Sequence, residues 1–118
     1  MPPVHHIPAE GALLSSGADA LGLIYGDGVG DAEWIAVPAA RLDPAFFTLS
    51  SGVAGEFVQK FANYGLRLAI VGDISEPLAQ SASLRDFVRE SNRGWQVWFV
   101  ADADELAQRL LTQQPPRP

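Results

Sequence analysis

The sequence contains no cysteine. This absence excludes disulfide bonds, zinc sites built from thiolates and thiol nucleophiles, and it suits a reducing cytoplasm. Histidine is almost as scarce, since His5 and His6 are the only two. Neighbouring residues of a strand point to opposite faces, so this pair is poorly arranged to chelate one metal ion. A Ser-His-Asp catalytic group also has little to be built from, and we expect no catalytic residues of that kind, no metal and no cofactor.

Basic side chains and long apolar runs are also few. Eight Lys and Arg residues stand against fourteen Asp and Glu residues, and the basic ones are spread along the chain. Such a charge distribution would be repelled by a phosphate backbone. No segment approaches the ~20 apolar residues of a membrane span, and the start MPPVHHIPAEGALL lacks the pattern of a signal peptide. We therefore expect a cytoplasmic protein that binds neither nucleic acid nor membranes.

What is present is typical of one globular domain. The chain has 118 residues, of which 47% are hydrophobic and 19% charged. This is enough for one hydrophobic core and too short for two independent ones. We expect a single domain over residues 1–111. The segment TQQPPRP at 112–118 is rich in proline and lacks apolar periodicity, so we expect a disordered tail there.

The apolar pattern predicts an α/β fold. Strands are expected at 4–7, 11–14, 34–38, 66–71 and 95–100, of which the first two would form an opening hairpin. Helices are expected after Ser16, over 51–64, after a capping box formed by Ser83 and Asp86, and from Asp102 to 111. The order β-β-α-β-α-β-α-β-α predicts a mostly parallel central sheet with packed helices, because helix-linked strands run parallel. Ligands bind at the carboxyl ends of the strands in such sheets.

The segment LSSGVAGEFVQKFANYGLRLAIVGDIS at 49–75, together with the order of elements over 34–111, resembles the STAS domain of bacterial anti-sigma factor antagonists. In that fold a stretch like Asp-Ser-Ser-Gly-Leu-Gly opens the central helix, and a partner kinase phosphorylates its serine. The resemblance implies a STAS-like regulatory domain with a protein partner and phosphorylation at Ser50 or Ser51. The sequence departs from that pattern at Leu49, where the antagonists have aspartate. A serine here also serves simply as a helix N-cap, which is the commoner role.

A second match lies in the same region. The segment SGVAGEFVQKFANY at 51–64 follows the pattern T/S-G-x-A-G-E-x-x-Q-K-F-x-N-Y, and LAIVGD at 68–73 and DFVRESNRG at 86–94 come after it. On these residues the chain is identified as a member of the bacterial family known as domain of unknown function 4180. Membership implies no activity, because the family has none assigned.

The candidate binding residues lie around the start of the central helix and the loop after the next strand. They are Ser50, Ser51, Gly52, Glu56, Lys60, Asn63 and Asp73. A hydroxyl at a helix N-terminus can stabilise an anion. The residues at 56, 60 and 63 share one helix face, which is suited to a ligand or partner but is more often simply solvated. Asp73 directly follows an apolar strand, a position where functional carboxylates are frequent. The pair Gly72-Asp73 is also typical of an ordinary turn.

Two further features have structural interpretations. The run GDGVGD at 26–31 is expected to be a helix-to-strand connection, since a phosphate-binding loop follows a strand and opens a helix. Trp95 and Trp98 are expected on opposite faces of one strand, mainly in the core, although one of them could be exposed to a partner.

Our leading hypothesis is a non-enzymatic regulatory module that binds a protein partner or a small molecule near the start of the central helix. The alternative is a small cytosolic enzyme that uses carboxylate acid–base chemistry, in which Asp73, Asp86 and Glu90 converge. A third hypothesis is a plain interaction or dimerisation module, which could form a homodimer.

Overall fold

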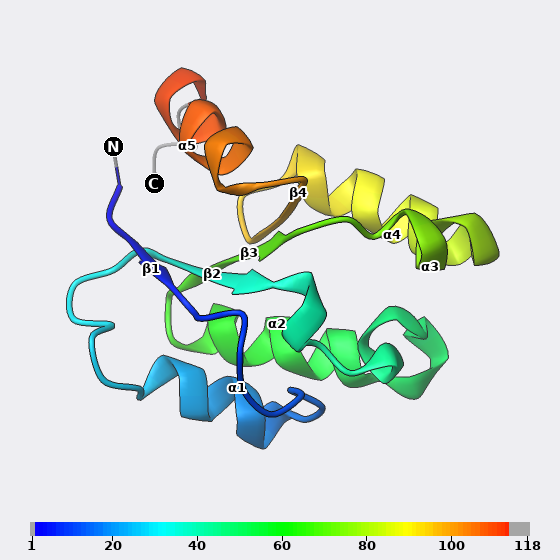
Figure 1. The fold of residues 1–118 in the computed structure, drawn as a ribbon, viewed down its shortest axis with the longest axis horizontal. Helices are drawn as coiled ribbons and strands as arrows, with labels where there is room; N and C mark the ends of the chain where they lie inside the picture. Colours follow the sequence, from blue (N-terminus) through cyan, green and yellow to red (C-terminus); the bar gives the residue numbers. More distant parts are fainter. Residues whose placement is uncertain (1, 114–118) are drawn as a thin grey trace.

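The computed structural model describes residues 2–113 and has the predicted α/β architecture (Figure 1). Its strands are β1 (Val4–His6), β2 (Trp34–Pro38), β3 (Arg67–Val71) and β4 (Val97–Val100). They form one parallel sheet in the order β1-β2-β3-β4. The helices are α1 (Gly17–Ile24), α2 (Val53–Asn63), α3 (Ser75–Gln80), α4 (Ala82–Arg93) and α5 (Ala103–Thr112). None of the helices within residues 2–113 is long and apolar enough to cross a membrane.

The sheet is covered on both faces, which explains why its inner strands are apolar at successive positions. Figure 1 shows α1 and α2 on one side of the sheet and α5 on the other. Ile35 and Val37 of β2 pack in the core on the α1 and α2 side, where Phe57 of α2 is also buried. Trp34 and Ala36 of the same strand pack in the second core under α5. The alternation along β2 thus divides the hydrophobic residues between two cores.

The predicted second strand at 11–14 is wrong, and no opening hairpin forms. Leu14 makes only one isolated parallel bridge, to Leu42. The preceding loop is held instead by the Arg41 guanidinium group, which donates hydrogen bonds of 2.9 to 3.1 Å to the backbone carbonyls of Pro8, Glu10 and Ala12. These carbonyls find their partner in a side chain, so the segment needs no strand neighbour.

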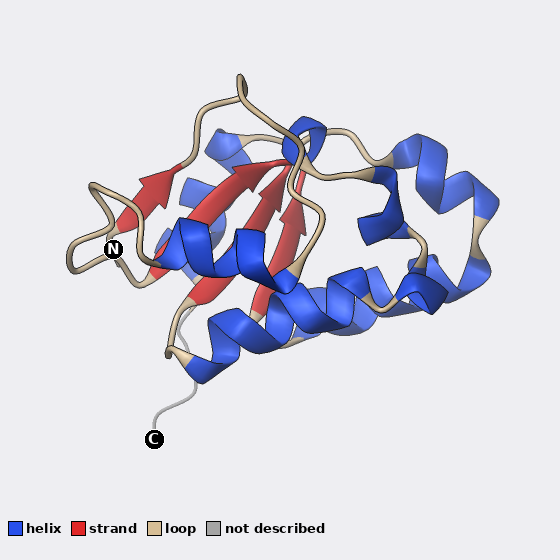
Figure 2. Cartoon of the chain, turned by 90° about the horizontal axis from the view of Figure 1, so that it is seen from below, coloured by secondary structure: helices blue, strands red, loops and turns tan. Residues whose placement is uncertain are grey.

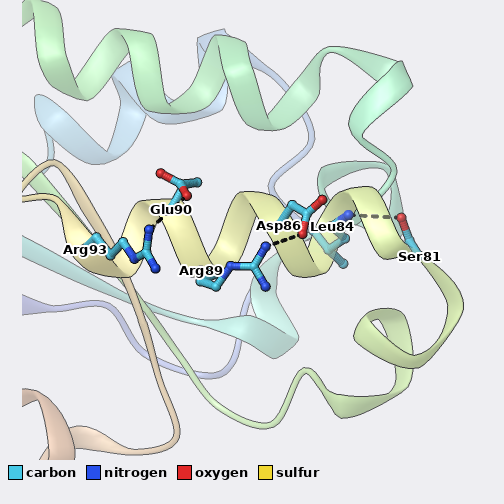
Figure 3. A network of polar contacts seen from close by, with 6 residues as sticks. All are labelled: Ser81, Leu84, Asp86, Arg89, Glu90 and Arg93. Atoms are coloured by element: carbon cyan, nitrogen blue, oxygen red, sulfur yellow. Dashed lines mark hydrogen bonds and ion pairs between the residues drawn. The ribbon is translucent and has the colours of Figure 1, made fainter.

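The region after β3 is predicted to be a loop, but it contains helix α3. Pro77 is the third residue of α3, in the first turn, where the missing N–H of proline costs little. The predicted capping box of Ser83 and Asp86 is also wrong. The N-cap of α4 is Ser81, whose hydroxyl accepts a hydrogen bond of 3.1 Å from the Leu84 N–H (Figure 3).

Other element boundaries also differ from the prediction. Helix α2 begins at Val53, after Gly52, which has a left-handed conformation at φ 80°. Trp95 precedes β4, so the alternation of that strand does not extend to it. Its ring lies 5.1 Å from the ring of Trp98. Both rings pack in the core under α5, so the prediction that they lie on opposite faces is wrong. Residues 114–118 of the predicted tail lie outside the described residues. The first residue of that predicted tail, Thr112, is the last residue of α5.

Candidate functional site

An open pocket of about 820 Å³ lies at the carboxyl ends of β2 and β3. The strands run in one direction (Figure 2), so the segments that follow them meet at the same edge of the sheet. One wall comes from residues between 38 and 50, and the other comes from residues between 71 and 83, which include Glu76, Pro77 and Gln80 of α3. Ligands of parallel α/β proteins bind at this edge, and small-molecule sites have volumes of about 300 to 1,000 Å³. The pocket therefore has the location and the size of a ligand site.

The first wall is a series of tight turns. Pro38 ends β2, and three short 3-10 turns follow at Ala39–Arg41, Pro44–Phe47 and Leu49–Ser51. Phe46 is fully buried, with its ring 5.6 Å from that of Phe57, and this contact anchors the wall to α2. The neighbouring Phe47 lines the pocket. The connection after β2 thus contributes one phenylalanine ring to the core and the next one to the lining of the pocket.

The second wall begins at the glycine that follows β3. Gly72 has φ 140°, and a Cβ atom there would lie 3.2 Å from the Ala39 Cβ of the first wall. Only glycine combines this conformation with such a close approach of the two walls. Next, the Asp73 carboxylate accepts a hydrogen bond of 2.9 Å from the Ser75 N–H. This backbone hydrogen bond lowers the pKa of Asp73, whose side chain is exposed and lines the pocket.

The polar lining of the pocket is acidic. Asp73 and Glu76 both line it, and no Lys, Arg or His does so among residues 2–113. Hydroxyl groups are contributed by Thr48, Ser50 and other serines. The histidines lie elsewhere, on β1, and in the described part of the chain no group of three or more His, Asp and Glu side chains could hold a metal ion. Ionic recognition in this pocket would therefore depend on its two carboxylates.

A family model described as Domain of unknown function (DUF4180) matches residues 2–110. The chain belongs to the DUF4180 family. The match includes both walls of the pocket, so the pocket is part of this DUF4180 domain. No match was found among curated proteins or among solved structures. The likeness to the STAS domain stays a prediction.

The structure of this DUF4180 domain brings two of the predicted site residues into one pocket. Ser50 and Asp73 come from opposite walls. Ser51 is adjacent but does not line the pocket, because its hydroxyl donates a hydrogen bond of 2.6 Å to the Ala45 carbonyl and accepts one of 3.2 Å from the Val53 N–H. This hydroxyl thus stabilises the turn that precedes α2. The predicted N-cap role is nevertheless wrong, because the N-cap of α2 is Gly52, which has no side chain to cap the helix.

Of the four remaining candidates, Gly52 is the N-cap of α2, and Glu56, Lys60 and Asn63 lie on that helix. None of the four lines the pocket. Glu56 accepts a hydrogen bond of 3.0 Å from the Gly17 N–H, so it joins the start of α1 to α2. Asn63 accepts a hydrogen bond of 2.8 Å from the side chain of Gln59 on its own helix. The contacts of Glu56 and Asn63 are structural, and a ligand role for this face stays a prediction.

Sequence reasoning missed most of the apolar lining of this DUF4180 domain. Phe47 and Leu49 fall in a connection, and Pro77 falls in the helix that was not predicted. The available signal was the sequence Asp43-Pro44 followed by two phenylalanines, since two large aromatic residues seldom occur in a connection without packing against something. Glu76 was also missed, because it lies in α3, where the sequence predicts a loop.

Proposed function

We propose that this DUF4180 domain is a binding module that holds a small molecule in the pocket between the turns after β2 and helix α3. The observation that carries the proposal is the concave shape of the pocket at the carboxyl edge of a parallel sheet. Apolar groups from Phe47, Leu49 and Ile74 form much of its surface, with a few polar side chains between them. This combination is typical of sites for small organic ligands. The absence of cysteine suits a cytoplasmic role for the module.

The alternative of a carboxylate enzyme has less support. Asp86 and Glu90 pair with Arg89 and Arg93 on the surface of α4 (Figure 3), with N···O distances of 2.5 and 3.4 Å. They do not line the pocket with Asp73. The pKa of Asp73 is lowered by its backbone hydrogen bond, whereas a general acid or base works best with a pKa near the working pH. Binding therefore explains the pocket better than proton transfer does.

Binding of a small molecule also has more support than a phosphorylation switch. A phosphate on Ser50 would add about −1.5 to −2 charge to a pocket that already contains two carboxylates and no cationic side chain among the described residues. The Ser51 hydroxyl is already engaged with the backbone on both sides. A phosphate at either position would thus meet repulsion or break the start of α2.

The test is a titration of ¹⁵N-labelled protein with a fragment library that contains neutral, anionic and cationic compounds. Binding compounds are expected to shift the amide signals of Ala39, Ala40, Gly72 and Asp73, which lie in the two walls. Ala40 is exposed and lines the pocket, so Ala40→Trp should fill the pocket and abolish these shifts. Ala18→Trp is the matched control, because Ala18 is also exposed but lies on α1. Fragments that shift signals elsewhere, or bind Ala40→Trp as tightly as wild type, would show that the pocket is not the binding site.

A further inference from the structure

We propose that the pocket selects a small organic cation, namely a primary amine carried on an apolar body. The inference rests on the proposed function, because it names the ligand class of the same site. Three observations support it: the charge of the lining, the engagement of the nearby arginines, and the apolar walls.

The charged groups that line the pocket in the described part of the chain all have one sign. Asp73 lies at the end of β3, and Glu76 lies three residues later in the first turn of α3, so both carboxylates belong to the same wall. Both side chains are exposed to solvent and available to a ligand. Asp73 uses its Oδ1 atom for the Ser75 N–H. A carboxylate can accept several hydrogen bonds, so this bond leaves acceptor capacity for an ammonium group.

The nearby arginines are engaged elsewhere. Arg41 follows the pocket residues Ala39 and Ala40, but its guanidinium group donates to three backbone carbonyls of the loop that precedes α1. Arg85 lies on α4 and donates a hydrogen bond of 2.6 Å to the Leu78 carbonyl at α3. Neither arginine lines the pocket. Within residues 2–113 the two carboxylates are therefore without a cationic partner, and a ligand can supply one.

The apolar walls require more than a simple inorganic cation. Phe47 and Leu49 from the first wall face a space shared with Ile74 and Pro77 from the second. Covering these groups with an apolar ligand removes their surface from water, which is favourable. A hydrated metal ion would gain nothing from these walls, whereas an aromatic or aliphatic amine would contact both the walls and the carboxylates.

The charge complementarity holds at neutral pH. The lowered pKa of Asp73 keeps its carboxylate ionised. An alkylamine resembles the lysine side chain, whose pKa is about 10.4, and is therefore protonated under the same conditions.

The experiment compares three probes that share one phenyl body: 2-phenylethylamine, 2-phenylethanol and 3-phenylpropionate. Each is titrated into ¹⁵N-labelled protein, and the dissociation constant is taken from the amide signals of the pocket walls. The amine is expected to bind about tenfold more tightly than the alcohol, as two solvent-exposed ion pairs would provide. The carboxylate is expected to bind more weakly than the alcohol. Added salt should weaken binding of the amine and leave that of the alcohol almost unchanged.

Charge-neutralising variants test which groups are responsible. Asp73→Asn and Glu76→Gln should each weaken amine binding about threefold to fivefold, with little effect on the alcohol. Asparagine keeps an oxygen that can accept the Ser75 N–H, so the turn should survive. The matched control is Asp27→Asn, since Asp27 is exposed in the connection that enters β2 at the opposite edge of the sheet. This control changes the net charge equally and should leave amine binding unchanged.

Some outcomes would overturn the inference and leave the proposed function standing. One is equal binding of all three probes in the pocket, and another is amine binding that ignores both charge-neutralising variants. Tighter binding of N-acetyl-lysine methylamide than of 2-phenylethylamine would also overturn it, because the pocket would then fit a lysine of a protein partner. If none of the three probes shifts the amide signals of the pocket walls, the cation inference fails. The proposed function fails as well only if no compound of the fragment library shifts these signals.

Discussion

The contact between Gly17 and Glu56 allows a stability prediction that starts from geometry. Gly17 is buried at the first position of α1, and its N–H donates a hydrogen bond of 3.0 Å to the Glu56 carboxylate on α2. In the variant Gly17→Ala, the added Cβ would overlap the Glu56 Oε1 atom and lie 2.8 Å from the Cδ and Cγ atoms. The glutamate side chain would have to move, and the hydrogen bond would be lost.

The expected cost is the difference between two effects. A hydrogen bond to a charged group contributes about 1.5 to 3 kcal/mol. Replacing glycine by alanine at a compatible position recovers about 0.4 to 1 kcal/mol, because the unfolded chain has less conformational freedom. We therefore expect Gly17→Ala to lower the free energy of unfolding by about 1 to 2 kcal/mol.

Urea unfolding followed by tryptophan fluorescence measures this free energy, and a double-mutant cycle isolates the contact. In a Glu56→Ala background the obstacle is absent, so adding Gly17→Ala should be neutral or stabilising. If Gly17→Ala alone is as stable as wild type, or if its cost is the same in the Glu56→Ala background, the proposed contact between the two helices is wrong.

Three further predictions concern other parts of the molecule. Asn92 accepts a hydrogen bond of 2.7 Å from the N–H of Phe99 in the edge strand β4, so Asn92→Ala should destabilise the fold by about 1 to 2 kcal/mol and promote self-association. Urea unfolding and light scattering check this, and a variant that stays monomeric at wild-type stability would count against it. The Arg109 guanidinium group lies 3.9 Å from the ring centre of Trp98 and also donates a hydrogen bond to the Asn92 carbonyl. Arg109→Lys should cost about 1 kcal/mol in the same unfolding assay, because a lysine cannot stack in this way while donating to Asn92. An unchanged unfolding midpoint would show that the stacking contributes nothing. The pKa of Asp73 is below its ordinary value of 3.8, so its charge adds stability above that pH and the contribution is lost as the pH falls through the lowered pKa. Unfolding measured from pH 7 to below the lowered pKa should therefore show wild type and Asp73→Asn converging on acidification, and a gap that persists or widens across this range would contradict the cause given for the shift.

The sequence by itself determined the α/β class and the main elements. The apolar segments at 34–38 and 66–71, with an amphipathic helix between them, predict two parallel strands, because a short connection cannot join strands that run in the same direction. The pocket lies at the carboxyl edge of the sheet, where the sequence predicts ligand binding, and Asp73 lines it. Ligand binding there stays a prediction. These features depend on local periodicity, which a single sequence displays.

Local choices between near-equal alternatives were predicted less well. Ser81 and Ser83 are both competent caps, and the choice between them depends on how α4 packs against its neighbours. The segment 11–14 has the composition of a strand. However, the backbone carbonyls in and before it accept hydrogen bonds from Arg41, about thirty residues later in the chain.

Only the tertiary structure decided the role of Glu56 and the shape of the pocket. Glu56 was predicted as a surface ligand group, yet its hydrogen-bond partner Gly17 is 39 residues away in the sequence. The pocket likewise exists because the segments after β2 and β3 meet at Ala39 and Gly72. Contacts between distant segments depend on how the elements pack together, and periodicity within any one element carries no information about them.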